Sequence, residues 1–219
     1  LIKDLTMNKK LIIWDWNGTL LNDVDACVNS MNHMLNKRSR TNITQEYYKS
    51  IFTFPVQKYY EKLGFDFIKE PFEELSIEYI DLYIKYAKKS PLQEGAIELL
   101  QYFKFKGIKQ VILSASEQNS LENQVKQRDI DEYFDVLIGL NNIHAKSKVQ
   151  NAIDFISNSS LTFDQIILIG DTFHDLEVAS EINAECILVS NGHQVLSKRK
   201  INGNAILVDS LRDILHLDI

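Results

Sequence analysis

The apolar residues of this chain gather into short runs, and each run ends at a polar or small residue. The runs are strand-sized, rich in Ile, Leu and Val, and nearly continuous in their apolar character. That pattern is typical of strands buried on both faces, as in a parallel sheet covered by helices. The predicted strands lie at residues 11–14, 108–113, 136–138, 165–169, 186–189 and 205–208.

Stretches with helical periodicity separate most of these predicted strands. An alternation of strands and helices predicts an α/β fold, namely a doubly wound parallel sheet with a Rossmann-like core. The predicted helices lie at residues 95–106, 117–127, 148–156 and 174–182.

The interval at residues 23–90 departs from this alternation. It carries apolar positions at helical spacing, such as Tyr79 and Tyr83, and no convincing strand. Because the interval directly follows the first strand, we expect it to lie over the carboxyl ends of the strands, where open α/β sheets bind ligands. We therefore predict an α/β core formed by residues 8–22 and 91–219, with residues 23–90 inserted as a helical cap.

Composition narrows the class of protein. The 219 residues are 45% hydrophobic and 25% charged, which fits a globular protein. A formal net charge of −6 argues against a nucleic-acid partner, and the short basic run at residues 198–200 fits a solvated helix end. No apolar run approaches the ~20 residues that a membrane-spanning helix needs, so no membrane partner is expected.

Cys27 and Cys186 lie far apart in apolar periodic segments, so we expect two buried thiols and not a disulfide framework. Reduced thiols favour a cytoplasmic location. No secretory signal is visible in the sequence, and the residues before position 8 are left out of the fold prediction. A monomer or a homodimer is expected.

The first predicted strand leads into the sequence DWNGTL at residues 15–20. Asp15 is thus expected to project from the carboxyl end of the strand into a loop that Gly18 allows to turn tightly. A carboxylate there can attack phosphorus and form an acyl phosphate, which water later cleaves. Taken alone, Asp15 is equally well interpreted as an ordinary strand-end residue, since short motifs match by chance.

A second predicted strand, at residues 165–169, leads into the sequence GDTFHD. Asp171 and Asp175 therefore lie on a tight loop at the start of a helix. These two carboxylates and Asp15 would repel one another unless a cation neutralised them. Mg²⁺ fits an oxygen-only site that keeps several waters and one phosphate oxygen of a substrate. The alternative for Asp175 is a residue of the first helical turn that interacts with the helix dipole.

Two further residues could contact a phosphoryl group. Ser114 follows a predicted strand, and its hydroxyl could donate to a phosphoryl oxygen, although Ser116 competes with it as a helix N-cap. Lys148 begins the helix before Asp171 and could offset the charge of the nucleophile and the phosphate. Lys146 is its rival, and an exposed position is the default for either lysine.

In chain order, these motifs resemble those of haloacid dehalogenase-type phosphatases over nearly the whole sequence, and the likeness is greatest to the phosphoglycolate phosphatase-like branch. The resemblance implies that the helical insertion is a cap and that Lys148, by its distance to Asp171, is preferred to Lys146. The implied catalytic residues are Asp15 as nucleophile, Asn17, Ser114 and Lys148. The implied phosphate-binding residues are Gly18, Thr19, Ser114, Ala115 and Lys148. The implied Mg²⁺ ligands are Asp15, Asp171, Asp175 and the backbone carbonyl of Asn17.

Asn17 departs from the pattern of that family, because phosphatases of this type usually carry a second Asp there, which protonates the leaving group and then activates water. An amide can do neither, and general acid/base catalysis typically contributes about 10²–10⁴-fold to the rate. The backbone carbonyl of Asn17 is unchanged, so metal binding is expected to survive.

The expected function is Mg²⁺-dependent hydrolysis of a small phosphorylated metabolite through an aspartyl phosphate on Asp15, with phosphoglycolate as the candidate substrate. Two alternatives stay open. The sequence also resembles phosphonoacetaldehyde hydrolases, which form a Schiff base on a cap lysine, and Lys58 lies near the expected place, although a surface lysine is the simpler interpretation. The other alternative is a module that binds phosphate and Mg²⁺ without turnover. The histidines His144, His174 and His193 show no spacing typical of a metal site and are expected in loops.

Overall fold

Parallel strands form one sheet in the order β3-β2-β1-β4-β5-β6, within a computed structural model that describes residues 9–140, 148–197, 201 and 205–217. His144, Lys146 and the basic run at residues 198–200 lie outside the described residues. The strands are β1 (Leu11–Trp14), β2 (Lys109–Glu117), β3 (Val136–Leu140), β4 (Ile166–Gly170), β5 (Glu185–Val189) and β6 (Ala205–Val208).

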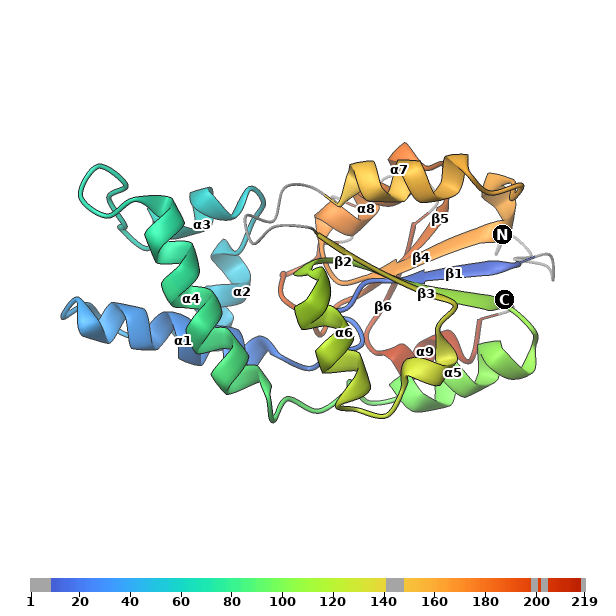
Figure 1. Ribbon diagram of the computed structural model, residues 1–219, viewed down its shortest axis with the longest axis horizontal. Coiled ribbons are helices and arrows are strands. Elements are labelled where there is room, and N and C mark those ends of the chain that lie inside the picture. The colour runs from blue at the N-terminus through green and yellow to red at the C-terminus, as the bar shows by residue number, and fades with distance from the viewer. Residues whose placement is uncertain (1–8, 141–147, 198–200, 202–204, 218–219) are drawn as a thin grey trace.

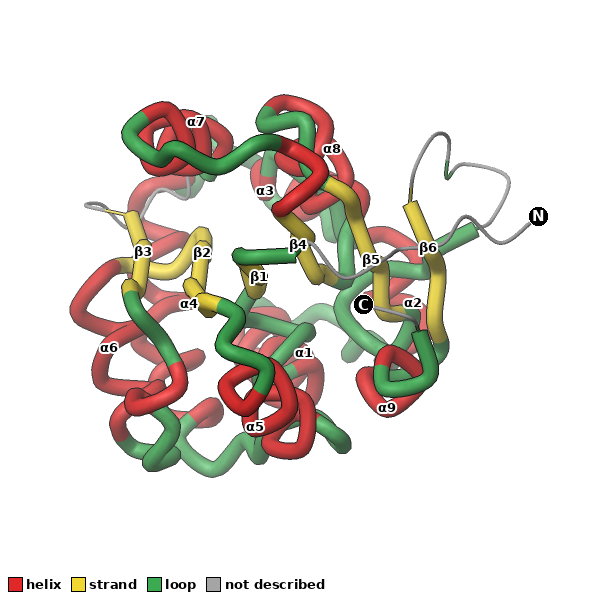
Figure 2. The backbone as a smooth tube through the Cα atoms, turned by 90° about the vertical axis from the view of Figure 1, so that its right-hand side faces the viewer, coloured by secondary structure: helices red, strands yellow, loops and turns green. Residues whose placement is uncertain are grey.

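Helices cover both faces of this sheet (Figure 1). Alternate residues of β1 point to opposite faces, as the two-residue period of a strand requires. Ile12 and Trp14 pack with α5, α6 and α9, whereas Leu11 and Ile13 pack with α7 and α8. The covering helices are α5 (Ala96–Phe105), α6 (Gln118–Lys126), α7 (Val149–Ser157), α8 (Phe173–Glu181) and α9 (Leu211–Ile214), with 3₁₀ turns at Asp131–Tyr133 and Phe163–Gln165. The predicted doubly wound α/β fold is confirmed, and Figure 2 shows the sheet with β3 and β6 at its edges.

Four helices occupy the interval between β1 and α5, and Figure 1 shows them beyond one end of the sheet. They are α1 (Val24–Lys37), α2 (Gln45–Ile51), α3 (Val56–Lys62) and α4 (Phe72–Ala87). Their apolar side chains, among them Met31, Met34 and Leu75, form a hydrophobic cluster of their own. The interval is helical, as expected, while its exact boundaries as a cap at residues 23–90 stay a prediction.

The central strand β1 lies between β2 and β4, so the chain reverses its direction of winding there. In this register Trp14 is paired with Ile169, and the backbone N–H of Asp15 donates to the carbonyl of Ile169 over 2.8 Å. The residues that follow β1 and β4 therefore meet. Crevices at such reversal points are where open α/β sheets bind ligands.

Strand β2 is longer than the sequence predicts, because it continues through Ser114 to Glu117 with a register shift against β3. Ser114 thus lies within a strand and not after one. Cys27 and Cys186 are both buried free thiols, as predicted. Among the described residues, no helix is long and apolar enough to cross a membrane.

Candidate active site

Asp15 follows the last residue of β1, and its side chain is buried among groups that hold both carboxylate oxygens. Lys148 Nζ lies 2.5 Å from Oδ1, and the hydroxyl of Thr19 donates to Oδ2 over 2.9 Å. The same hydroxyl lies 3.2 Å from Asp171 Oδ1, but it carries one proton and can donate to one carboxylate at a time. Thr19 therefore links the strand ends of β1 and β4.

Lys148 is buried at the start of α7, which sets it apart from an ordinary surface lysine. Its ammonium lies between two carboxylates, 2.5 Å from Asp15 Oδ1 and 2.6 Å from Asp175 Oδ1. Burial alone would lower the pKa of this lysine, but the two carboxylates raise it above its ordinary value. Lys148 is therefore a fixed positive charge beside Asp15.

Asp175 combines the two roles that its sequence position suggests. Its Oδ2 accepts hydrogen bonds from the hydroxyl of Thr172 over 2.7 Å and from the backbone N–H of Thr172 over 2.9 Å, which caps the start of α8. Its Oδ1 faces Lys148. Burial would raise the pKa of Asp175, but Lys148 and the hydrogen bonds from Thr172 lower it, so this carboxylate is held ionised.

One carboxylate oxygen from each of Asp15, Asp171 and Asp175 lies within 4.8 Å of the other two, and all three residues are buried. Burial, together with repulsion from Asp15 and Asp175, raises the pKa of Asp171 to about 8, although His193 opposes the rise. Burial also raises the pKa of Asp15 in spite of Lys148. One lysine thus leaves this cluster with excess negative charge, and a divalent cation with oxygen ligands fits the donor set.

Gly18 has a φ of +77°, a left-handed conformation that favours glycine. A side chain at this position would also collide with the carboxylate of Asp171 and the ring of His193. The tight turn expected from the sequence is therefore present. Gly18 and Thr19 lie behind the cavity surface, so their direct contact with a phosphate stays a prediction.

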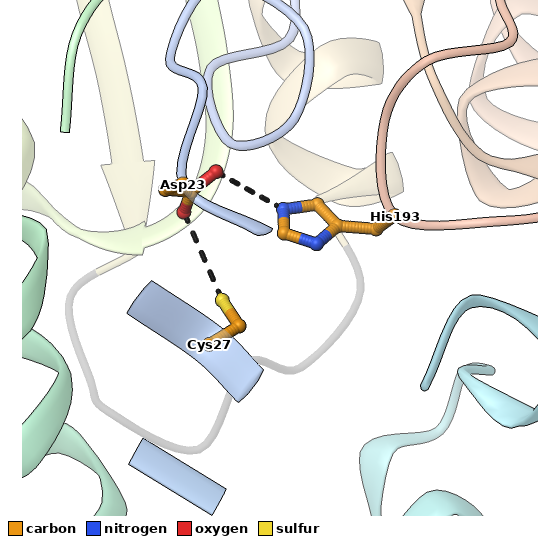
Figure 3. Close-up of side chains that lie close together, drawn as sticks. All are labelled: Asp23, Cys27 and His193. Carbon is orange, nitrogen blue, oxygen red and sulfur yellow. Dashed lines mark hydrogen bonds and ion pairs between the residues drawn. The ribbon is translucent and has the colours of Figure 1, made fainter. Parts of the chain in front are cut away.

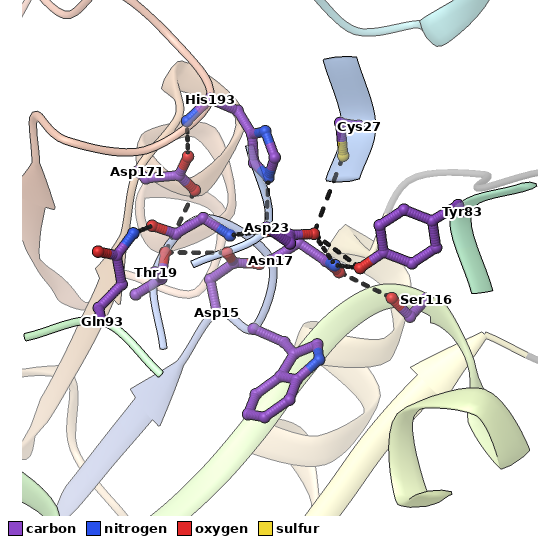
Figure 4. A network of polar contacts seen from close by, with 12 residues as sticks. Asp15, Asn17, Thr19, Asp23, Cys27, Tyr83, Gln93, Ser116, Asp171 and His193 are labelled. Atoms are coloured by element: carbon purple, nitrogen blue, oxygen red, sulfur yellow. Dashed lines mark hydrogen bonds and ion pairs between the residues drawn. The ribbon is translucent and has the colours of Figure 1, made fainter. Parts of the chain in front are cut away.

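The side chain of Asn17 is held at both ends (Figure 4). Its amide nitrogen donates to Asp23 Oδ2 over 2.8 Å and lies 2.6 Å from the hydroxyl of Tyr83, and its Oδ1 accepts from Ser116 Oγ over 2.7 Å. These contacts fix which end of the amide faces which neighbour. None of these contacts gives residue 17 a group that could protonate a leaving group in the cavity.

Ser114 and Ser116 both lie within β2, and neither caps a helix, because Glu117 is the N-cap of α6. Ser114 is buried, and its Oγ accepts a hydrogen bond from the backbone N–H of Ser116 over 3.0 Å. Ala115 and Ser116 line the cavity instead. Ser116 thus lies on the cavity surface, while the expected contact of Ser114 with a phosphoryl oxygen stays a prediction.

Sequence reasoning missed Asp23, whose buried carboxylate joins three parts of the chain (Figure 3). Its Oδ1 accepts from the backbone N–H of Gly18 over 2.8 Å and lies 3.2 Å from His193 Nε2, and its Oδ2 lies 3.9 Å from Cys27 Sγ. His193 Nδ1 is 2.9 Å from the hydroxyl of Tyr48. The i, i+4 spacing of Asp23 and Cys27 at the start of α1 places these two side chains near each other, but no spacing in the sequence links them to His193 or Tyr48.

The Asp23–His193 pair is charged. Burial would raise the pKa of Asp23, but the charge and hydrogen bond of His193 lower it. Burial would lower the pKa of His193, but Asp23 raises it to about 9. The expected loop position is correct for His193, which lies after β5 but is buried, and wrong for His174, which lies within α8 and also lines the cavity.

A cavity of about 400 Å³ lies between the strand ends and the helices α2 to α4. Asp15, Lys148 and Asp171 lie on its floor. Lys58 is exposed on α3 and is absent from the residues that line the cavity. The arrangement brings a buried carboxylate, a fixed ammonium and a cluster of acidic ligands to one end of this cavity.

Comparison with known proteins identifies the architecture. The family model for haloacid dehalogenase-like hydrolases matches residues 12–189. A protein of Caldanaerobacter subterraneus named as a pyrophosphatase, PpaX, is 21% identical over 183 residues, which cover 81% of this chain and 80% of that protein.

Solved structures share the fold. The haloacid dehalogenase-like protein SP0104 of Streptococcus pneumoniae superposes with a TM-score of 0.80 at 16% identity, covering 96% of this chain and 99% of that one. A Haemophilus somnus protein described as a predicted phosphoglycolate phosphatase gives a TM-score of 0.77 at 18% identity, covering 98% and 100%. The sequence match, the strand order and the acidic strand ends agree: the chain belongs to the haloacid dehalogenase-like hydrolase family.

Proposed function

We propose that this hydrolase is a Mg²⁺-dependent phosphatase that cleaves a small phosphorylated metabolite through an aspartyl phosphate on Asp15. The observation that supports it most directly is the position of Asp15, which lies on the cavity floor between the ammonium of Lys148 and the hydroxyl of Thr19. A carboxylate held in one orientation can attack a phosphorus atom in line with its leaving group.

The chain itself supplies most of the parts that such a reaction needs. Lys148 would offset the charge of the attacking carboxylate and of the phosphoryl oxygens. Ala115 and Ser116 line the cavity, and the backbone around Ala115 would donate to those oxygens. The hydroxyl of Ser116 would have to turn away from Asn17 Oδ1 to do the same. Water would then attack the phosphorus of the aspartyl phosphate, which releases phosphate and restores the carboxylate of Asp15.

The proposed Mg²⁺ ligands are Asp15, Asp171, Asp175 and the backbone carbonyl of Asn17. Support for a cation comes from the raised pKa of Asp171 and the excess of carboxylates over ammonium groups in this buried cluster. When bound, Mg²⁺ would supply positive charge to the phosphoryl oxygens and allow the carboxylates to be ionised together.

Trapping the intermediate tests this proposal. We expect release of phosphate from acetyl phosphate in the presence of Mg²⁺, and borohydride reduction of the intermediate should convert residue 15 into homoserine, which peptide mass spectrometry detects. Asp15→Asn is the matched control, because it keeps the shape of the side chain but removes the nucleophile. Equal turnover by Asp15→Asn would rule out an aspartyl phosphate at this residue.

Phosphoglycolate, the substrate suggested by resemblance, stays a candidate, and the name of the Caldanaerobacter relative adds pyrophosphate. Cleavage of a phosphonate through a Schiff base is less well supported, because Lys58 is exposed and lies outside the cavity lining. The cytoplasmic location favoured by two buried thiols is likewise a proposal.

A phosphate-binding module with little turnover is the second candidate, and the position of the amide of Asn17 favours it. The contacts of Asn17 with Asp23, Tyr83 and Ser116 leave no carboxyl group at the place of the usual acid. A multiple-turnover assay separates the two candidates, since a module of this kind would bind phosphate and Mg²⁺ but release no product beyond one equivalent.

A further inference from the structure

The part of the cavity that is formed by residues 24–90, called here the cap wall, carries no charge. Residues 24–90 are all described in the structure, and those that line the cavity are aromatic, aliphatic or small and neutral. The half-buried rings of Phe52, Phe54 and Tyr83 are part of this wall. Phe54 also lies against the ring of His174 across the cavity, with 4.8 Å between ring centroids. The wall thus offers stacking and apolar contact.

Two groups on the floor that could pair with an anion are already engaged: the ammonium of Lys148 lies between Asp15 and Asp175, and the ring of His193 is paired with Asp23. His174 Nδ1 lies 3.0 Å from Glu177 Oε2. A leaving group with a second negative charge would therefore lose its hydration against the cap wall without finding a counter-charge among the described residues. Phosphoglycolate and pyrophosphate both carry such a charge.

The cap wall includes residues with polar groups, and the hydroxyls of Tyr48 and Tyr83 are hydrogen-bonded to His193 and Asp23. Tyr59 lines the cavity, and its hydroxyl is buried and has no hydrogen-bond partner among the described residues. A buried hydroxyl without a partner is costly and rare in native proteins. Because this hydroxyl is closed off from solvent, a ligand in the cavity meets little polar surface at Tyr59, which favours a leaving group that is apolar over most of its surface.

The chemistry at Asn17 indicates the same kind of leaving group by an independent route. Without an acid at this position, the departing oxygen must leave without a proton. A phenol has a pKa of about 10, as for the side chain of tyrosine. An alkyl alcohol is far weaker as an acid, closer to water with a pKa of about 16. A phenolate therefore leaves more readily than an alkoxide when nothing protonates it.

We propose that the cavity takes an aryl phosphate monoester whose ring carries no charge, an inference that rests on the proposed phosphatase function. A carboxylate oxygen of Asp15 forms a bond to phosphorus as the bond from phosphorus to the aryl oxygen breaks. The phenolate leaves with the electron pair and takes a proton from solvent. Water then attacks the aspartyl phosphate at phosphorus, and inorganic phosphate departs while the carboxylate is restored.

A set of matched substrates tests this inference on the full chain with Mg²⁺. Phenyl phosphate is compared with 4-carboxyphenyl phosphate, phosphoglycolate and pyrophosphate. Acetyl phosphate is the control, because its small leaving group depends little on contact with the cap wall. We expect kcat/KM for phenyl phosphate to exceed that of each of the three charged compounds by about tenfold or more.

The outcomes distinguish a failure of the aryl-phosphate inference from a failure of the proposed phosphatase function. If acetyl phosphate is hydrolysed in a reaction that needs Asp15 but phosphoglycolate or pyrophosphate matches phenyl phosphate, the aryl inference is overturned while the phosphatase function stands. If acetyl phosphate is not hydrolysed beyond the rate of Asp15→Asn, the phosphatase proposal fails and the aryl inference fails with it.

A charge placed on the cap wall provides a second test. Ile80 lines the cavity from α4, whereas Ile77 on the same helix is 50% exposed and lies outside the lining. For Ile80→Arg, we expect kcat/KM for 4-carboxyphenyl phosphate, divided by kcat/KM for phenyl phosphate, to rise by about tenfold. The reason is one new ion pair in a partly buried site. Ile77→Arg should leave the ratio unchanged. An identical response of the two variants would contradict the assigned role of the cap wall.

Discussion

The amide nitrogen of Asn17 donates a hydrogen bond to Asp23 Oδ2 over 2.8 Å, so a carboxylate faces the position where related phosphatases carry their acid. If residue 17 were Asp, its carboxyl group would lie beside that of Asp23 in a buried site. Two neighbouring carboxylates disfavour joint ionisation, so one of them would keep its proton. A protonated carboxyl at residue 17 is the form that donates to a leaving group.

Asn17→Asp is therefore expected to raise the steady-state rate by about 10²–10⁴-fold, with a larger gain for alkyl than for aryl phosphates. Parallel assays with phenyl phosphate and an alkyl phosphate measure both effects. Because an Asn-Gly sequence deamidates readily, mass spectrometry of residue 17 must accompany the assay. Alkyl cleavage by homogeneous Asn17 protein at the rate of the variant would show that another group supplies the proton.

Asp171→Asn should abolish Mg²⁺ binding and activity while the fold is kept. The amide oxygen can still accept the hydrogen bond from the backbone N–H of His193, but one negative charge is lost from the cluster. Mg²⁺ at one hundred times its Kd should raise the free energy of unfolding of the wild-type protein by about 2.7 kcal/mol, and that of the variant hardly at all. Denaturant titrations with and without Mg²⁺ provide the measurement, and an equal Mg²⁺ effect in both proteins would refute the assigned ligand set.

Asp23→Ala should lower the free energy of unfolding by about 3–5 kcal/mol, because it leaves the charged ring of His193 buried without its partner. Urea denaturation measures the loss. Glu132→Ala is the matched control, since it breaks the exposed pair of Glu132 with Lys104 and should change stability little. Similar losses in the two variants would mean that the buried pair contributes no more than a surface contact.

Tyr59→Phe should raise the free energy of unfolding of the ligand-free protein by about 1 kcal/mol, because it removes a buried hydroxyl that has no partner. Tyr48→Phe is the matched comparison and should be destabilising, since the hydroxyl of Tyr48 lies 2.9 Å from His193 Nδ1. Thermal and urea unfolding of both variants check the opposite signs. A loss of stability in Tyr59→Phe would show that its hydroxyl is already satisfied.

Lys58→Ala should change KM modestly and leave catalysis in place, because this lysine is exposed on α3 and lies away from the cavity lining. The measurement is kcat and KM for a phosphate monoester, together with borohydride treatment in the presence of phosphonoacetaldehyde. Loss of all chemistry along with a trapped imine at residue 58 would favour the phosphonate alternative instead.

The sequence alone was enough to predict the sheet and the acidic strand ends. Continuous apolar runs mark strands buried on both faces, and each run is short enough to exclude a buried helix. Because parallel strands end at one edge, the sequence is enough to predict that Asp15 after β1 and Asp171 after β4 lie close together. Local pattern and chain direction decide these features, and both can be read from neighbouring residues.

The tertiary structure alone decided which side chains face one another. Asp23 and His193 pair across 170 positions of sequence, and Ser116 replaces Ser114 on the cavity surface because β2 continues past the expected end. The neutral cap wall likewise depends on which side chains of the four cap helices point into the cavity. Such relationships arise from the packing of elements that are distant in the chain, and packing sets side-chain direction and burial in ways that no local sequence pattern records.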